Sequence, residues 1–274
     1  MTISEYKAML ARFQGSIRTP EDFEAVWTRQ MTRSVLSVST SRMPFHNHAA
    51  VYENLSISYD GGEVNARVIR PASEGPHPLI LMFHDLNRGV RGWHHMTRFI
   101  AQGYCVIALD AEPWVGDWTQ SPEEIRFPQR YTDALILANY ARTLPFIDPR
   151  RIAAWGEGFG GGLAIAVSAL LPEPVRCIAL NPFPGDIRGI CRDRDEAVYA
   201  MLDYVELASF APLIKGPSLF GVCLMDEVAK PEGQFAIYNR LTCPHTLKTY
   251  PKFIHERLNF FENEILRFLH DEQA

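Results

Sequence analysis

The chain has 274 residues, of which 47% are hydrophobic, and this is enough to bury one large core. Its formal charge is −5 and its pI is about 6.0, without an arginine-rich segment, so the composition favours neither nucleic acid nor an anionic membrane as a partner. We therefore expect a small neutral or weakly polar ligand.

The cysteines are odd in number, scattered and mostly placed in apolar runs, which is typical of small buried hydrophobic residues and not of disulfides: Cys105, Cys177, Cys191, Cys223 and Cys243. No group of His, Cys or acidic residues has the spacing of metal ligands, and we expect neither a metal nor another cofactor. The first residues carry charge where a signal peptide needs an apolar core, and no run approaches transmembrane length. These features predict a cytoplasmic protein.

Residues 3–36 have a helical pattern. Apolar residues recur at helical spacing near the start, and Thr19-Pro20-Glu21-Asp22 resembles the cap of a second helix that contains Trp27. We predict an N-terminal helical arm over residues 1–48, followed by one main domain over 49–274. Trp27 needs cover, which either the main domain or a neighbouring subunit would supply.

The main domain has the pattern of an α/β fold. Residues 51–59 and 64–70 alternate apolar and polar positions around Asp60-Gly61-Gly62, which predicts a hairpin. Continuous apolar runs then occur at 79–83, 104–109, 151–155, 175–180, 218–224 and 246–250, separated by helical patterns near 93–102, 128–144, 160–170, 193–206, 231–241 and 256–270. Such runs predict a mostly parallel central sheet with helices on both faces, whose ligands bind at the carboxyl ends of the strands.

The segment 152–166 has the most specific pattern in the chain. An apolar run leads into glycines and continues as a helix of small residues, which is the strand, tight turn and helix that hold the nucleophile in α/β-hydrolases. Gly156 and Gly160 flank the central position of the turn, as the crowded backbone there requires. The central residue is Gly158, so the nucleophile position is vacant.

Two further residues follow late strands in the order of a hydrolase triad. Asp226 comes after the run 218–224, and His255 comes between the run 246–250 and the last helix. Each alone would be an ordinary turn or loop residue, but their joint order predicts an acid that orients a base. Glu157 lies next to the turn centre, and we expect its side chain to point away from the pocket.

The loop Phe83-His84-Asp85-Leu86-Asn87 follows the first long strand. In this fold that loop supplies one backbone amide of the oxyanion hole, and the residue after the nucleophile supplies the other, which predicts Leu86 and Phe159 as anion-binding donors. We interpret His84 first as a structural histidine that ties the loop to a carbonyl. The irregular stretch 111–127 is expected to add to the pocket wall, which would contain Trp114, Trp118, His84 and Asp85.

Segments over nearly the whole chain match one enzyme family: Thr19-Pro20-Glu21-Asp22-Phe23; Phe83-His84-Asp85-Leu86-Asn87; Trp93-His94 followed by Ala101-Gln102-Gly103-Tyr104; Arg130-Tyr131-Thr132-Asp133-Ala134; Leu144-Pro145-Phe146-Ile147-Asp148-Pro149-Arg150-Arg151-Ile152; Leu224-Met225-Asp226; and Tyr250-Pro251-Lys252-Phe253-Ile254-His255-Glu256. On these segments the chain resembles the acetyl xylan esterase and cephalosporin-C deacetylase family. The resemblance implies an α/β-hydrolase fold with an N-terminal arm, assembly into a homo-oligomer, often a hexameric ring, and deacetylation of a small acetylated substrate. It places the acid at Asp226, the base at His255 and the oxyanion donors at Leu86 and Phe159.

The chain departs from the family pattern at the site itself. Gly158 stands at the serine position, and Asp85 stands where glycine is usual in the oxyanion loop. Ala111-Glu112-Pro113-Trp114 replaces the family's Arg-Gly-Gln-Gly motif, and the following insertion is shortened to Gly116-Asp117-Trp118. These changes weigh against ester hydrolysis and indicate a reshaped pocket.

Three functions fit these residues. The first is a lyase that eliminates acetate from an acetylated small molecule, with His255 as the base, Asp226 stabilising the imidazolium and the two amides receiving the acetate charge. Acetylated tetronate rings in polyketide pathways are one known setting for such chemistry. The second is an acetyl ester hydrolase inactivated by a serine-to-glycine change. The third is a non-catalytic binding homologue.

Overall fold

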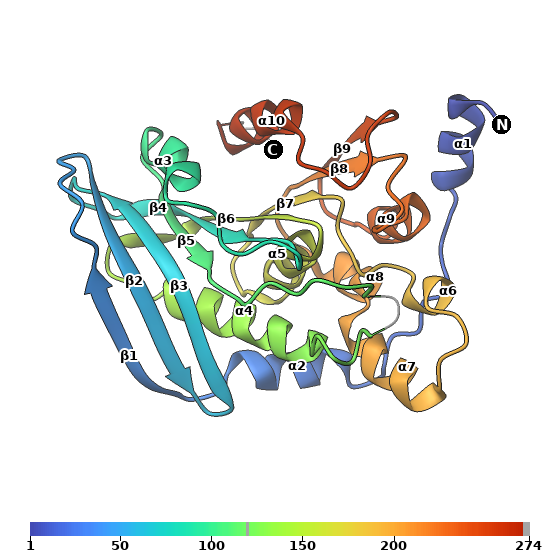
Figure 1. Ribbon diagram of the computed structural model, residues 1–274, viewed down its shortest axis with the longest axis horizontal. Coiled ribbons are helices and arrows are strands. Elements are labelled where there is room, and N and C mark those ends of the chain that lie inside the picture. The colour runs from blue at the N-terminus through green and yellow to red at the C-terminus, as the bar shows by residue number, and fades with distance from the viewer. Residues whose placement is uncertain (119–120, 271–274) are drawn as a thin grey trace.

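The apolar runs form the centre of a nine-stranded sheet in the computed structural model, which describes residues 1–118 and 121–270 (Figure 1). The strands are β1 (Val35–Arg42), β2 (Ala50–Tyr59), β3 (Gly62–Pro71), β4 (His77–Phe83), β5 (Cys105–Leu109), β6 (Ile147–Glu157), β7 (Arg176–Leu180), β8 (Ser218–Cys223) and β9 (His245–Tyr250). The helices are α1 (Ile3–Leu10), α2 (Phe23–Met31), α3 (His94–Ile100), α4 (Phe127–Ala141), α5 (Phe159–Leu170), α6 (Ile187–Ile190), α7 (Glu196–Leu202), α8 (Leu207–Phe210), α9 (Pro231–Tyr238) and α10 (Asn259–His270), with 3-10 turns at Asp203–Val205 and Ala211–Leu213.

The sheet is mixed but mostly parallel. Its order is β1-β2-β3-β5-β4-β6-β7-β8-β9, in which β1, β2 and β3 pair antiparallel, β3 pairs antiparallel with β5, and the strands from β5 to β9 are parallel. Helices α3 and α10 cover one face, whereas α2, α4, α5 and α8 cover the other (Figure 1). The α/β architecture predicted from the apolar runs is confirmed.

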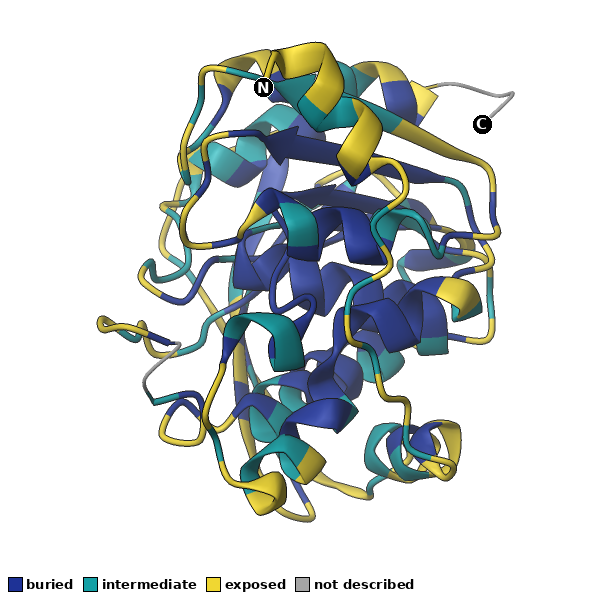
Figure 2. Ribbon diagram, turned by 90° about the vertical axis from the view of Figure 1, so that its right-hand side faces the viewer, coloured by how far each residue is buried: buried dark blue, intermediate teal, exposed yellow. Residues whose placement is uncertain are grey.

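Burial on both faces explains why the central strands have continuous apolar sequences. Nearly all residues of the central strands and of α5 are buried. Figure 2 shows the buried residues in the interior and the exposed residues on the outer helices and turns. The carboxyl ends of β4, β6, β8 and β9 lead into the segments that contain Asp85, Gly158, Asp226 and His255. Because neighbouring parallel strands end at the same edge of the sheet, these four residues can meet there.

The first part of the chain differs from the prediction in one element. Residues 35–42 form β1, which pairs with β2 in a register that aligns Val38 with Ile57, so the prediction of helix to residue 36 and of a helical arm to residue 48 is wrong over this stretch. Every residue of β1 is exposed. An edge strand of this kind is held by backbone hydrogen bonds, and it has no buried face that would give the sequence a periodic pattern.

The helices of the arm pack on the same chain. Trp27 of α2 is buried, and its indole Nε1–H donates to the carbonyl of Tyr204 at 2.8 Å. Leu10 of α1 is buried in a small cluster with Phe235 of α9. The main domain therefore supplies the cover that Trp27 requires. Within the described residues, no helix combines the length and the apolar composition needed to cross a membrane.

Candidate active site

The turn between β6 and α5 has the backbone geometry of a nucleophile elbow. Gly158 adopts φ +57° and ψ −126°, a conformation that strains any residue with a side chain. The flanking glycines are required by close packing, because a Cβ on Gly156 would lie 2.0 Å from the carbonyl oxygen of Gly160. The amide of Gly158 donates to Leu180 of the neighbouring strand β7 at 2.8 Å. The elbow is thus fully formed around a residue without a side chain.

The carboxylate of Asp85 occupies the space beside Gly158. A Cβ built on Gly158 would lie 2.2 Å from Oδ1 of Asp85 and 2.7 Å from Oδ2. Oδ1 accepts hydrogen bonds from the amides of Leu86 at 2.8 Å and Phe159 at 2.9 Å. The two amides predicted to bind an anion therefore bind one that the protein itself provides. Asp85, predicted for the pocket wall, lines the cavity at this site and also lies at the centre of its hydrogen bonds.

His255 joins Asp85 to Asp226. Its Nδ1 lies 2.7 Å from Oδ2 of Asp226, and its Nε2 lies 2.9 Å from Oδ2 of Asp85. Asp226 is held in turn because its Oδ1 accepts from the amides of Val228 and Ala229 at 2.9 and 2.8 Å. The structure brings together the acid and the histidine predicted from the sequence, and it adds a second carboxylate on the far side of the imidazole.

The two carboxylates change the charge state of His255. Burial acts to lower the pKa of His255, but its hydrogen bonds to Asp226 and Asp85 outweigh burial and raise this pKa to about 9. Burial acts to raise the pKa of Asp85, yet the hydrogen bonds from His255, Phe159 and Leu86 hold it below its ordinary value. At neutral pH the site therefore contains an imidazolium between two carboxylates.

A small cavity borders this group. Its volume is about 10 Å³, room for about one water molecule, and its walls are Asp85, Arg88, Glu157, Gly158, Leu180, Asn181, His255 and Glu256. A larger substrate must therefore displace the side chains at its rim. Within the described residues, no cluster of three or more His, Cys, Asp or Glu side chains is arranged to hold a metal ion.

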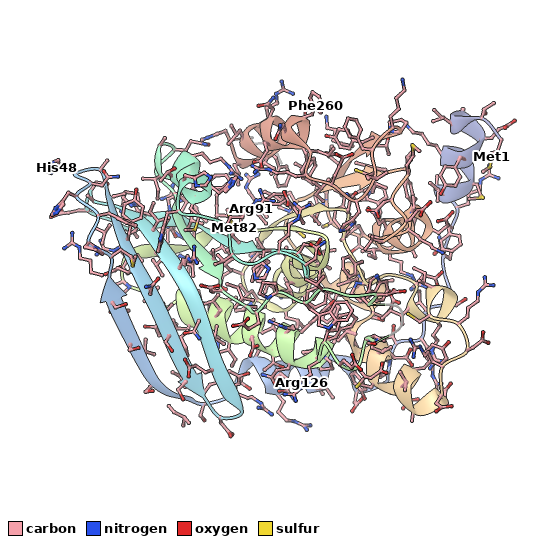
Figure 3. The ribbon with its side chains drawn as sticks, viewed as in Figure 1. Met1, His48, Met82, Arg91, Arg126 and Phe260 are labelled. Carbon is pink, nitrogen blue, oxygen red and sulfur yellow. The ribbon has the colours of Figure 1, made fainter. Side chains whose placement is uncertain are left out.

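Glu157 forms ion pairs and lines the cavity. It forms a short ion pair with Arg91 and a longer one, at 3.9 Å, with Arg88. Burial raises the pKa of Glu157, and the charge of Arg91 opposes that rise. Figure 3 shows Arg91 beside Met82 near the middle of the molecule, where both line a second cavity next to Glu157. The prediction that Glu157 points away from the pocket is therefore wrong.

His84 has the contacts of a structural residue. Its Nδ1 lies 2.8 Å from the backbone carbonyl of Asp85, and its Nε2 accepts from the amide of Ala111 at 3.3 Å. Burial lowers the pKa of His84, so the ring is neutral with its proton on Nδ1. It ties the loop after β4 to the loop after β5 and lines the cavities beside Asp85.

The two tryptophans expected in the pocket wall have different surroundings. Trp118 is 4% exposed, and its ring packs against Phe127 and Phe183. It belongs to the hydrophobic core and is linked to the site through Phe183, whose ring centroid lies 5.8 Å from that of His255. Trp114 is half-buried, and its amide donates to the carbonyl of Leu86 at 2.5 Å.

Sequence reasoning missed the role of Asp85 and did not single out Arg88 or Phe183. A signal for Asp85 was present, because an aspartate stands in the loop expected to supply an oxyanion donor and the elbow residue Gly158 has no side chain. A carboxylate in that loop and a glycine at the elbow fit together, because the acid fills the space beside Gly158. Arg88 gave no comparable signal, since an arginine in a loop is usually solvated.

Comparisons with known proteins agree with this fold. The chain is similar to acetyl xylan esterase 1 from Thermoanaerobacterium sp., with 24% identity, a TM-score of 0.84 and coverage of 98% of each chain. It is also similar to an acetyl xylan esterase from Paenibacillus sp. R4, with 21% identity, a TM-score of 0.81 and coverage of 98% of this chain and 99% of the other. At such identities the likeness shows the α/β-hydrolase fold alone.

Curated relatives match over a shorter stretch. The quorum-quenching protein AidA of Acinetobacter baumannii is 33% identical over 134 residues, which are 47% of this chain and 44% of the relative. Esterase FrsA of Klebsiella pneumoniae is 24% identical over 124 residues, which are 43% of this chain and 28% of the relative. The matches thus span less than half the length of either relative.

A family model described as acetyl xylan esterase (AXE1) matches residues 5–123, 114–192 and 188–272, which together cover nearly the whole chain. The α/β-hydrolase elbow and the order of Asp226 and His255 agree with that match. The chain belongs to the acetyl xylan esterase (AXE1) family.

Proposed function

We propose that this protein eliminates acetate from an acetylated small molecule, with Asp85 and His255 as a proton-transfer pair. The observation that carries the proposal is the position of the Asp85 carboxylate, which fills the space that a side chain on Gly158 would occupy and contacts the imidazolium of His255 at 2.9 Å. Family membership supports an acetyl ester as the substrate. The glycine at the elbow and the carboxylate beside it support a different way of breaking the carbon–oxygen bond of that ester.

Hydrolysis by the serine route lacks two requirements at this site. An acyl-enzyme needs a nucleophile at the elbow, and Gly158 has none. A tetrahedral intermediate needs free donors for its oxyanion, whereas the amides of Leu86 and Phe159 already bind Asp85. The site still contains the carboxylate of Asp85 beside the imidazolium of His255, and such a pair can remove and deliver a proton.

The reaction follows from the atoms of this pair. Oδ2 of Asp85 takes the proton from the carbon next to a substrate carbonyl, and the electrons of that C–H bond move toward the carbonyl oxygen to form an enolate. The enolate then collapses to the alkene as the carbon–oxygen bond to acetate breaks. The proton on Nε2 of His255 passes to the departing acetate. Asp85 then returns its proton to His255, so the products are an alkene and acetic acid and the pair is restored.

This assignment changes the roles expected from the sequence. With a pKa of about 9, His255 is protonated at neutral pH and its Nε2 faces Asp85, so the first base is Asp85. The amides of Leu86 and Phe159 hold this base in place and do not bind the leaving group. Asp226 keeps its expected role, because it orients the imidazole and stabilises its charge.

Hydrolysis through Asp85 is the second candidate, favoured by the position of the carboxylate. Both amides hold Oδ1, which leaves Oδ2 for attack on an acetyl carbon, while His255 can give its proton to the departing alcohol. The product would be a mixed anhydride on Asp85 that water then cleaves. This route gives the alcohol and acetate, whereas elimination gives the alkene and acetic acid.

The test is product analysis. The purified protein, Asp85→Asn and His255→Ala are incubated with acetoxymethyl lactones, an acetoxybutanone with its acetoxy group β to the carbonyl, and acetylated sugars, and the products are identified by mass spectrometry. Elimination predicts an alkene, one water lighter than the alcohol, that disappears in both variants. Formation of the alcohol would establish hydrolysis instead. Incorporation of heavy oxygen from labelled water into the carboxylate of Asp85 would identify the anhydride route. Absence of any product would favour a binding protein.

A further inference from the structure

Elimination creates negative charge on the carbonyl oxygen of the substrate as well as on the departing acetate. When the proton leaves the carbon next to a carbonyl, charge develops on the carbonyl oxygen, and an enolate forms only slowly without a positive group or donor beside it. The amides of Leu86 and Phe159 cannot serve, since Asp85 occupies both. The following inference rests on the proposed function and concerns the group that receives this charge.

Arg88 lies on the loop that holds Asp85. The amide of Arg88 donates to the carbonyl of Asp85 at 3.1 Å, closing a turn that places both side chains on the wall of one cavity. The side chain of Arg88 is 41% exposed. Among the described residues its guanidinium is assigned one ionic contact, at 3.9 Å from Glu157. This distance is long for a hydrogen bond, so the donors of Arg88 remain available to a ligand.

Several other polar groups of this region already have partners. Arg91 forms the short ion pair with Glu157, which neutralises that buried carboxylate. Oδ1 of Asn181 accepts from the amide of Cys223 at 2.8 Å and so ties β7 to the end of β8. The proton on Nε2 of His255 is directed at Asp85. His255 also lines this cavity, but its Nε2 is engaged by Asp85. Among the described residues of the wall, Arg88 is therefore the cation whose donors are left for a substrate.

We propose that the guanidinium of Arg88 binds the substrate carbonyl oxygen and stabilises the enolate that Asp85 generates. Arg88 thereby takes over the task that the backbone amides perform in a serine hydrolase. The assignment defines a substrate class, which is a compound with a carbonyl group β to its acetoxy group. An acetate ester without that carbonyl offers Arg88 no acceptor and has no acidic proton for Asp85.

The experiment separates proton removal from acetate departure. The acetoxybutanone named above reports the full reaction by proton NMR. The corresponding methoxybutanone, whose leaving group is poor, is kept in deuterium oxide and reports exchange of the proton next to the carbonyl. Wild type, Arg88→Met and Arg88→Lys are compared, with Arg29→Met as the control because Arg29 is an exposed arginine on α2. Thermal unfolding of each variant shows that the fold is kept.

Removing an oxyanion donor commonly lowers kcat by about 100-fold or more, and we expect a loss of about that size in both assays for Arg88→Met. KM should change little, Arg88→Lys should keep part of the rate, and Arg29→Met should equal wild type. Wild-type exchange in Arg88→Met would overturn the role of Arg88 and leave the elimination intact. Absence of exchange in the wild-type protein itself would overturn the elimination, and the role of Arg88 with it.

Discussion

The carboxylate of Asp85 and a side chain at position 158 cannot occupy the site together. A Cβ on Gly158 would lie 2.2 Å from Oδ1 of Asp85, and Asp85 is fixed there by two amides and by His255. The carboxylate of Asp85 can therefore occupy this position only because residue 158 is a glycine. Asp85 thus brings a reactive group to the position where a serine hydrolase has its nucleophile.

Gly158→Ser alone is expected to give no esterase. The new Cβ would collide with Asp85, and the strained backbone at this position costs about 1–3 kcal/mol for a residue with a side chain. We expect a lower unfolding midpoint in urea and no hydrolysis of nitrophenyl acetate. The double variant Asp85→Gly with Gly158→Ser removes the collision and frees both amides. It should show hydrolysis that is absent from each single variant, and esterase activity in the single Gly158→Ser protein would mean that Asp85 moves away easily.

Stability should depend on the titration of His255. The unfolded chain releases this proton near pH 6.5, whereas the folded protein holds it to about pH 9. A raised pKa stabilises the fold fully below pH 6.5 and loses its effect as the pH rises through 9, so we expect the free energy of unfolding to fall by up to about 3 kcal/mol over this interval. Asp85 acts in the opposite sense, since its lowered pKa stabilises the fold above the ordinary carboxyl pKa and the effect is lost in acid.

Urea unfolding at a series of pH values from neutral to alkaline measures the contribution of His255. His255→Gln is the control, because its amide does not titrate. The variant should be less stable than wild type at neutral pH, and the difference between the two proteins should shrink as the pH rises. A constant difference would show that another group is responsible for the pH dependence of wild type.

The sequence predicted the parts of the site that follow from strand order. The elbow at Gly158, the acid Asp226 and the base His255 each follow an apolar run, and parallel strands place their ends at one edge. The position of Asp85 depends on the path of a short loop and on the empty space at the elbow, and neither is encoded in a periodic pattern. Strand β1 was missed because all of its side chains are exposed, which removes the alternation by which half-buried strands are recognised.

The N-terminal arm should contribute strongly to stability. Trp27 is 1% exposed, its ring packs against Tyr131 and Phe210, and its Nε1–H has a carbonyl partner at Tyr204. Trp27→Ala should cost about 3–5 kcal/mol because it leaves a cavity, whereas Trp27→Phe should cost less, since it loses mainly the hydrogen bond and part of the ring. Urea unfolding monitored by circular dichroism measures both. Equal stability of Trp27→Ala and wild type would mean that the arm is not part of the cooperative unit.

Trp118 and Trp114 provide a matched pair for the last prediction. Trp118 is buried against Phe127 and Phe183, so Trp118→Ala should cost about 3–5 kcal/mol and loosen the ring that packs beside His255. Trp114 is half-buried and its hydrogen bond to Leu86 is made by its backbone, so Trp114→Ala should cost far less. Phe183 packs against both Trp118 and His255, so a loosened Phe183 should disturb the position of the imidazolium. Trp118→Phe keeps an aromatic ring beside Phe183 and should therefore preserve turnover better than Trp118→Ala. Equal unfolding midpoints for the two alanine variants would contradict the placement of Trp118 in the core.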